Sequence, residues 1–254
     1  MKNKPISTNT PSPLGRGLRG GAFYVIIVAG GTGTRMNNVV PKQFLELQGK
    51  PVLMHTIQKF IKAIPEINIV LVLSLQLREE WETLCVKHNF TIPSQLADGG
   101  DTRFHSVKNG LELVPENCIV GVHDAARPLV SEQTILKVFE TAEQKGNASP
   151  TIPLTESIRV IENNNNKAVD RANYFIVQTP QCFQSNLLKK AFLQEYRSTF
   201  TDDASVVEAM GEKINLIEGN RENIKITTPQ DLIIAEALIK KASSVVDTSK
   251  GEAK

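Results

Sequence analysis

The chain has 254 residues, of which 41% are hydrophobic and 22% charged, and this fits a soluble globular protein with one large core or two modest domains. It carries 29 basic and 27 acidic residues, but four of the basic ones lie in an acid-free segment at residues 1–21, which leaves 25 in the rest. This balance argues against a nucleic-acid partner, and the lack of a run of about 18 apolar residues argues against a membrane span, so we expect a cytoplasmic protein.

The first 21 residues are rich in proline, glycine, serine and threonine and lack the continuous apolar run of a secretory signal. We expect residues 1–21 to be a disordered leader outside the fold. An organelle transit peptide and a wrongly included upstream start codon are the alternatives that the sequence leaves open.

Short runs rich in β-branched residues then alternate with longer segments of helical period. The strand candidates are residues 23–29, 67–74 and 118–124, and the amphipathic helices that follow them are residues 52–64, 78–89 and 131–145. Almost continuous apolar residues are typical of strands that are covered on both faces. The alternation predicts an α/β fold with a mostly parallel sheet flanked by helices, and a ligand site at the carboxyl ends of the strands.

The pattern changes after Pro150, where two extended pieces flank four asparagines at residues 163–166. Asparagine suits a turn because it tolerates positive φ and bonds its own backbone. We predict a projecting β-hairpin arm at about residues 152–176, which is only marginally stable alone and so packs against a second subunit. A hairpin that lies on its own domain is the alternative.

The remaining elements are helices at residues 185–197 and 202–210, a strand at residues 214–219 and a last helix at residues 229–241. We expect residues 22–243 to form one domain and residues 244–254 to form a disordered tail.

A glycine-rich turn, AGGTGTRM, follows the first predicted strand. Such a turn gathers backbone N–H groups into a nest for phosphate oxygens. Met36 stands where the third glycine of a dinucleotide fingerprint belongs, and no Gly-Lys-Ser/Thr follows, so the turn is neither that fingerprint nor a P-loop. The glycines alone fit a plain structural turn equally well.

Two cations accompany this turn. Arg35 closes it, and Lys42 follows Pro41, which restrains the backbone. A guanidinium fork and an ammonium that converge on one polyphosphate stabilise charge on a transferring phosphoryl group. Solvation at the surface is the alternative for either side chain.

Two further motifs follow predicted strands. In DGGDTRFHS, Gly100 permits close backbone approach, and Asp101 and Ser106 offer hydrogen-bonding groups suited to a base edge, with a helix N-cap as the alternative. In VGVHDAARP, Asp124 ends a strand, where it is placed to hold Mg²⁺ against phosphate oxygens. Asp124 has two alternatives, which are capping of the next turn and pairing with Arg127.

Two more cations, Arg171 on the arm and Lys225 before the last helix, are candidate anion contacts. No zinc or disulfide pattern is found among the histidines or among Cys85, Cys118 and Cys182, which we expect to be thiols in a reducing compartment.

Seven motifs occur in a fixed order, namely AGGTGTRM, PKQFLELQGKPVL, GGDTRFHSV, HDAARP, DRANYFIVQTPQ, TDDAS and NIKITTPQDL. Together they closely resemble the 2-C-methyl-D-erythritol 4-phosphate cytidylyltransferase family of the non-mevalonate isoprenoid pathway, over about residues 23–239. Each motif is weak alone, whereas seven in order are highly specific. The resemblance implies a Rossmann-like nucleotidyltransferase fold and an Mg²⁺-dependent enzyme that transfers CMP from CTP to a polyol phosphate, methylerythritol 4-phosphate.

The resemblance also implies roles for single residues. Arg35 and Lys42 match the pair that stabilises the pentacoordinate phosphorus transition state. The nucleotide-binding positions are Ala29, Gly30, Gly31, Gly33, Gly100, Asp101, Ser106, Asp124 and Ala125, and Asp124 is also the metal position. The positions for the second substrate are Ser157, Arg171, Thr179, Thr201 and Lys225. The family's arm reaches into a neighbouring subunit, which implies a homodimer.

The chain departs from the family at two positions. Gly30 replaces a usual alanine and keeps the backbone donors, and Ser157 replaces a frequent threonine and keeps the hydroxyl. A ribitol-5-phosphate cytidylyltransferase, which resembles this family in most motifs, is the nearest rival. An inactive nucleotide-binding protein is the rival from another class.

Overall fold

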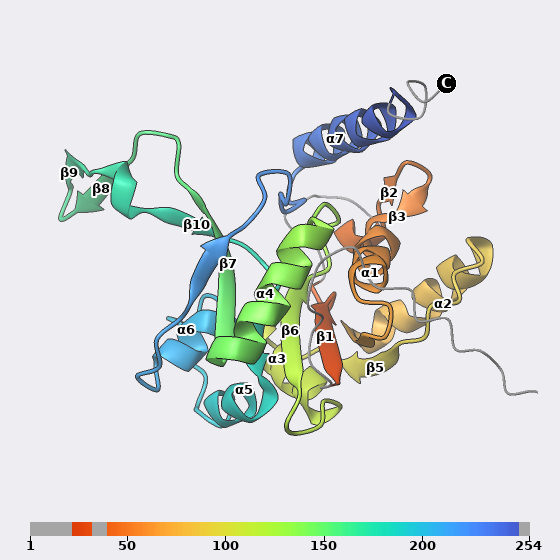
Figure 1. Cartoon of the computed structure of the whole chain (residues 1–254), viewed down its shortest axis with the longest axis horizontal. Coiled ribbons are helices and arrows are strands. Elements are labelled where there is room, and N and C mark those ends of the chain that lie inside the picture. The colour runs from red at the N-terminus through yellow and green to blue at the C-terminus, as the bar shows by residue number, and fades with distance from the viewer. Residues whose placement is uncertain (1–21, 32–39, 249–254) are drawn as a thin grey trace, which may run out of the picture.

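The computed structural model describes residues 22–31 and 40–248, with side chains described as far as residue 241. Its centre is a sheet with the strand order β10-β7-β11-β6-β1-β4-β5, and β12 pairs with β7 (Figure 1). The parallel half consists of β1 (Phe23–Val28), β4 (Asn68–Leu73), β5 (Gln95–Asp98) and β6 (Ile119–Asp124). The predicted α/β fold with a mostly parallel sheet is confirmed.

In the other half of the sheet, the strand predicted at residues 214–219 is confirmed as β12, whereas its neighbours were not predicted in detail. This half contains β7 (Asn147–Pro153), β10 (Phe175–Val177), β11 (Gln181–Gln184) and β12 (Leu216–Glu218). Here β11 runs antiparallel to both β6 and β7, and β10 runs antiparallel to β7. This half connects the central strands to the arm.

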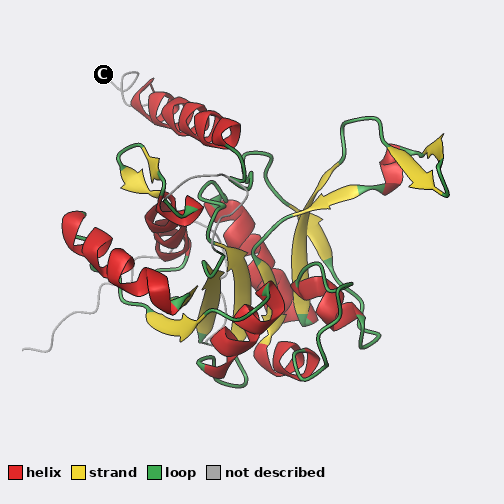
Figure 2. Cartoon of the chain, turned by 180° about the vertical axis from the view of Figure 1, so that it is seen from behind, coloured by secondary structure: helices red, strands yellow, loops and turns green. Residues whose placement is uncertain are grey.

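Helices cover both faces of the sheet (Figures 1 and 2). On one face, α1 (Val52–Ala63) and α4 (Glu132–Lys145) pack against alternate residues of β1, and α2 (Arg78–Lys87) adds Trp81 to the same core. On the other face, α3 (Arg103–Glu112), α5 (Ser185–Ala191) and α6 (Asp203–Glu208) pack against the remaining residues of the same strands. Because successive strand side chains point to opposite faces, a strand covered twice must be apolar throughout.

The arm projects from the sheet and ends in a hairpin of β8 (Arg159–Glu162) and β9 (Asn165–Ala168), as predicted (Figure 1). Asn163 and Asn164 have φ values of 48° and 62° at its turn. The predicted preference of asparagine for positive φ is therefore used at these two positions.

Two helix ends differ from the prediction. The helix predicted at residues 185–197 ends at Ala191, where the buried ring of Phe192 stacks on Phe104 with centroids 4.6 Å apart. The last helix, α7 (Pro229–Thr248), continues beyond residue 241, so residues 244–248 are helical and do not belong to a disordered tail. No glycine or proline interrupts the chain between Pro229 and Gly251, and such residues are the usual helix stops.

The described residues also form a hairpin of β2 (Glu46–Leu47) with β3 (Lys50–Pro51). Three short 3-10 helices are η2 (Lys42–Phe44), η3 (Leu75–Leu77) and η4 (Arg171–Asn173). Within the described residues, no helix is both long and apolar enough to cross a membrane. Cys118 and Cys182 are buried, Cys85 is half-buried, and all three are free thiols.

Candidate active site

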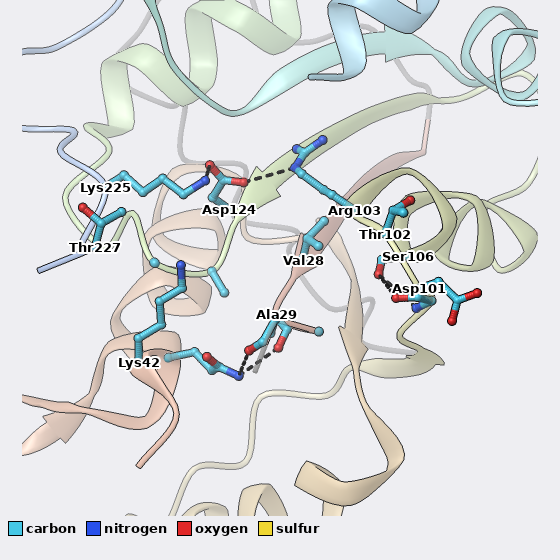
Figure 3. A pocket seen from close by; sticks show the side chains of 16 residues that line it. Val28, Ala29, Lys42, Asp101, Thr102, Arg103, Ser106, Asp124, Lys225 and Thr227 are labelled. Carbon is cyan, nitrogen blue, oxygen red and sulfur yellow. Dashed lines mark hydrogen bonds and ion pairs between the residues drawn. The ribbon is translucent and has the colours of Figure 1, made fainter. Parts of the chain in front are cut away.

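A cavity of about 500 Å³ lies at the carboxyl edge of the parallel strands (Figure 3). The sheet register aligns Val28 at the end of β1 with Asp124 at the end of β6. The loops that leave β1, β5 and β6 therefore meet there, together with η2 and the segment before α7. This volume lies within the range of small-molecule sites.

Most of the predicted site residues line this one cavity. They are Ala29, Gly30, Gly31, Lys42, Gly100, Asp101, Ser106, Asp124, Ala125 and Lys225. The predicted positions Gly33 and Arg35 lie outside the described residues.

The loop after β1 is held by a residue that the sequence analysis missed. Gln43 is 1% exposed, and its Nε2 donates hydrogen bonds to the carbonyl oxygens of Ala29 at 2.9 Å and Gly31 at 3.4 Å. Gln43 is the neighbour of Lys42, so the anchor of the loop also fixes the backbone that carries this cation. Figure 3 shows the Lys42 side chain extending towards the side of the cavity where Lys225 and Asp124 lie.

The loop after β5 forms the opposite wall. The N–H of Gly100 donates to Ser106 Oγ at 3.0 Å, and Thr102 caps α3 by accepting a hydrogen bond from the N–H of His105. The predicted alternative of a helix N-cap is therefore correct, and the same loop also lines the cavity. A Cβ at Gly30 would lie 3.4 Å from Ser106 Oγ, so the loop tolerates the alanine that the resembled family usually has there.

Three cations surround the carboxylate of Asp124. Its Oδ2 is 2.9 Å from Lys225 Nζ and 3.2 Å from Arg127 Nε, and its Oδ1 is 3.4 Å from Arg103 Nε. Burial by itself raises the pKa of Asp124, but the three cations outweigh it and hold the pKa well below its usual range. The predicted alternative of pairing with Arg127 is confirmed.

Asp124, the predicted metal position, is already paired with cations of the protein. Both oxygens of Asp124 already face cations, and the described part of the chain contains no group of three or more His, Cys, Asp or Glu residues that could hold a metal ion. Hard cations such as Mg²⁺ need several oxygen ligands. A divalent cation would have to bring most of its ligands with it.

Arg103 is a second residue that the sequence analysis did not single out, although it lies in the GGDTRFHSV motif. Its Nη1 and Nη2 donate to Asp203 Oδ1 at 2.9 Å and Oδ2 at 2.7 Å. Asp203 is fully buried. Burial raises the pKa of Asp203, and the guanidinium of Arg103 opposes this shift.

A second cavity of about 280 Å³ adjoins the first and shares Arg103, Asp124 and Lys225 with it. Thr179 and Thr201, two of the positions predicted for the second substrate, line this second cavity. Ser157 and Arg171, both exposed on the arm, line neither cavity in the single chain.

The hydroxyl of Thr179 forms hydrogen bonds to groups within the protein. It accepts a hydrogen bond from the N–H of Asp124 at 3.1 Å and lies 3.1 Å from Nδ1 of His123. The other ring nitrogen of His123, Nε2, lies 3.1 Å from the carbonyl oxygen of Arg127, which can only accept. Nε2 therefore carries the proton, and Thr179 donates to Nδ1. Burial lowers the pKa of His123 to about 4, so the ring is neutral at pH 7.

Thr179→Val is expected to lower the free energy of unfolding by about 1–3 kcal/mol, because the change leaves two buried polar groups without partners. Thr179→Ser keeps the hydroxyl and serves as the matched control. Urea unfolding of both variants checks this expectation, and equal stability of the valine and serine variants would contradict it.

The comparisons with known proteins point to one family. A family model described as 2-C-methyl-D-erythritol 4-phosphate cytidylyltransferase matches residues 23–241. The protein of that name from Bacteroides thetaiotaomicron is 52% identical over 215 residues, which cover 85% of this chain and 98% of the relative. The one from Bacillus velezensis is 40% identical over 225 residues, which cover 87% of this chain and 97% of the relative.

Solved structures agree with this match. The 4-diphosphocytidyl-2C-methyl-D-erythritol synthase of Anaerococcus prevotii has a TM-score of 0.73 at 26% identity and covers 87% of this chain and 96% of its own. The 2-C-methyl-D-erythritol 4-phosphate cytidylyltransferase of Thermus thermophilus has a TM-score of 0.68 at 31% identity and covers 86% of this chain and 99% of its own.

Proposed function

The chain belongs to the 2-C-methyl-D-erythritol 4-phosphate cytidylyltransferase family, and from this premise we propose that it transfers CMP from CTP to 2-C-methyl-D-erythritol 4-phosphate. The products are 4-diphosphocytidyl-2-C-methyl-D-erythritol and pyrophosphate. The observation that carries the proposal is the cavity at the sheet edge, which is lined by residues of the motifs after β1, β5 and β6 and before α7.

The two adjoining cavities suit two anionic substrates. We assign the larger one, beside the loops after β1 and β5, to CTP, and the smaller one to the polyol phosphate. Asp124 and Lys225 belong to both, so the two phosphate groups would meet beside them. A phosphate oxygen of the acceptor forms a bond to the α-phosphorus of CTP, while the bond from that phosphorus to the bridging oxygen breaks and pyrophosphate leaves.

This reaction needs little acid–base help from the protein. A phosphate monoester is already an anion near neutral pH, because its second pKa is about 6. The task of the site is therefore to bring two anions together and to stabilise charge on the phosphorus oxygens. Lys42, with Arg35, would do this at the nucleotide, and Lys225 would hold the acceptor phosphate.

Mg²⁺ is expected from the family, and the ion pairs of Asp124 indicate how the ion would reach the site. Since three cations already face that carboxylate, we infer that the ion arrives bound to the triphosphate of CTP. When bound, the ion neutralises charge on the triphosphate. The roles given above to the lysine side chains do not depend on it.

The arm would complete the acceptor cavity of a second copy of the chain, in a homodimer. Ser157 and Arg171 are exposed on it, and β10 at its base exposes Phe175, Ile176 and Val177 to between 41% and 50%. Three adjacent exposed apolar side chains on one strand are typical of a protein interface. We propose residues 22–243 as one catalytic domain with residues 152–176 as the dimerisation arm.

Arg171→Ala is expected to raise KM for the polyol phosphate about 10- to 100-fold, the usual effect of losing a charged hydrogen bond, and to leave KM for CTP nearly unchanged. Arg159→Ala, which removes another arginine from the same arm, is the matched control. Steady-state kinetics with each substrate varied in turn is the measurement. An effect confined to CTP would contradict the assignment.

The function itself is tested by measuring pyrophosphate release from CTP with methylerythritol 4-phosphate and, in parallel, with ribitol 5-phosphate. A strong preference for the former is the expected result. Preference for the latter would favour the ribitol phosphate enzyme on the same fold. Binding of CTP without pyrophosphate release from either substrate would favour an inactive nucleotide-binding protein.

A further inference from the structure

We propose that Arg103 is a positioning residue that orients Asp124, and through it Lys225, for the phosphate of the acceptor substrate. This role rests on the proposed function and acts through Asp124, although Arg103 itself also lines both cavities. The carrying observation is a chain of four charged groups that runs from a buried carboxylate to the shared wall of the two cavities. It consists of Asp203, Arg103, Asp124 and Lys225.

The first step concerns the guanidinium of Arg103, which Asp203 holds through the nitrogens that do not face Asp124. Both terminal nitrogens are bonded to the fully buried Asp203, at 2.9 and 2.7 Å. A bidentate pair of this kind fixes the plane of the guanidinium as well as its distance. Arg103 therefore has a set orientation before any ligand arrives.

The second step is that both members of this pair stand on rigid supports. Arg103 is the first residue of α3, which Thr102 caps, and Asp203 is the first residue of α6, which Asp202 and Ser205 close with a capping box. The buried side chain of Gln181 on β11 further ties the start of α6 to the sheet, by donating to Asp202 and accepting from the N–H of Ala204. Two capped helix ends are thereby locked together across 100 residues of sequence.

The third step concerns how the oxygens of Asp124 are shared. Arg103 Nε faces Oδ1, which leaves Oδ2 for Lys225 Nζ at 2.9 Å and for Arg127 Nε at 3.2 Å. The orientation of the carboxylate decides where Oδ2 points, and so where the ammonium of Lys225 stands. The side chain of Lys225 is 38% exposed and lines both cavities, so its position is open to a ligand.

A purely structural role for Arg103 makes a different prediction. If Arg103 only neutralises Asp203, then removing both charges together restores the balance and leaves the kinetics unchanged. If Arg103 positions Asp124, the same change frees Oδ1 and weakens the hold on the acceptor phosphate. The single change Arg103→Met leaves a buried carboxylate without a partner and is expected to fold poorly, so it is not the test.

The test is the double variant Arg103→Met/Asp203→Asn, which keeps the net charge of the protein. We expect KM for methylerythritol 4-phosphate to rise at least tenfold, with KM for CTP and the unfolding temperature close to those of the wild type. The matched control is Lys87→Met/Glu46→Gln, which removes an exposed ion pair away from both cavities and also keeps the net charge. An unchanged KM for the acceptor, or an equal rise in both KM values, overturns the proposal.

A binding measurement separates this proposal from the proposed function. Titration calorimetry with inorganic phosphate is carried out on the wild type and the double variant, without nucleotide. We expect phosphate to bind the double variant about tenfold more weakly, which is the loss of one well-placed contact. Equal binding overturns the positioning role, whereas a wild type that releases no pyrophosphate with any polyol phosphate overturns only the proposed function.

Discussion

Lys42→Ala is expected to lower kcat by about 10²- to 10³-fold while the protein stays folded, which is the scale for the loss of one group that stabilises transition-state charge. Lys42 lines the cavity at the end of the loop that follows β1. The residues next to it hold the backbone without its help, since Gln43 bonds the loop and Phe44 is buried against Trp81. The change therefore removes a charge from the reaction site while Gln43 and Phe44 still hold the neighbouring backbone.

The measurement is steady-state pyrophosphate release at saturating concentrations of both substrates, which gives kcat. Lys50→Ala is the matched control, because Lys50 lies nearby on β3, bonds Gln58 and does not line the cavity. Circular dichroism checks the fold of both variants. A kcat for Lys42→Ala within about fivefold of the wild type would contradict the proposed role of Lys42, because losing a transition-state contact lowers kcat far more than that.

Gly100→Ala is expected to lower kcat/KM for CTP by at least about 10²-fold, because small displacements of a positioned site cost this much. A Cβ at this position would lie 2.5 Å from the Cβ of His105 and 2.9 Å from its carbonyl carbon, both too close for atoms that are not bonded. His105 belongs to the first turn of α3, which the Thr102 cap holds in place. The loop must therefore move, and the hydrogen bond from Gly100 to Ser106 is lost with it.

The neighbouring glycine provides the control for this prediction. A Cβ at Gly99 would lie 3.5 Å from Ser74, an ordinary contact, and Gly99 does not line the cavity. Gly99→Ala should therefore keep its kcat/KM for CTP. Steady-state kinetics with CTP varied compares the two variants, and an equal kcat/KM for both would show that the close approach at Gly100 has no bearing on the nucleotide.

Much of the fold was predictable because its signals are local. Strands covered on both faces have continuous apolar residues, so β1, β4 and β6 were recognisable in the sequence. The asparagines of the arm indicated a turn with positive φ. The exact helix ends were not predictable, because tertiary packing decides them. Helix α5 ends at the residue before Phe192, whose ring stacks on Phe104 of helix α3.

The candidate site also has parts that the sequence predicted and parts that it did not. The glycine turns and the acid at the end of a strand were identifiable in the sequence, because backbone freedom and strand ends are properties of short segments. Apart from the pairing of Asp124 with Arg127, the partners of the charged groups were not identifiable, and neither Arg103 nor Asp203 was singled out. The sequence by itself determined which groups this protein has for binding phosphate. Only the tertiary structure decided that Asp124 faces three cations, since the strength of an ion pair depends on distance and burial in space and not on separation along the chain.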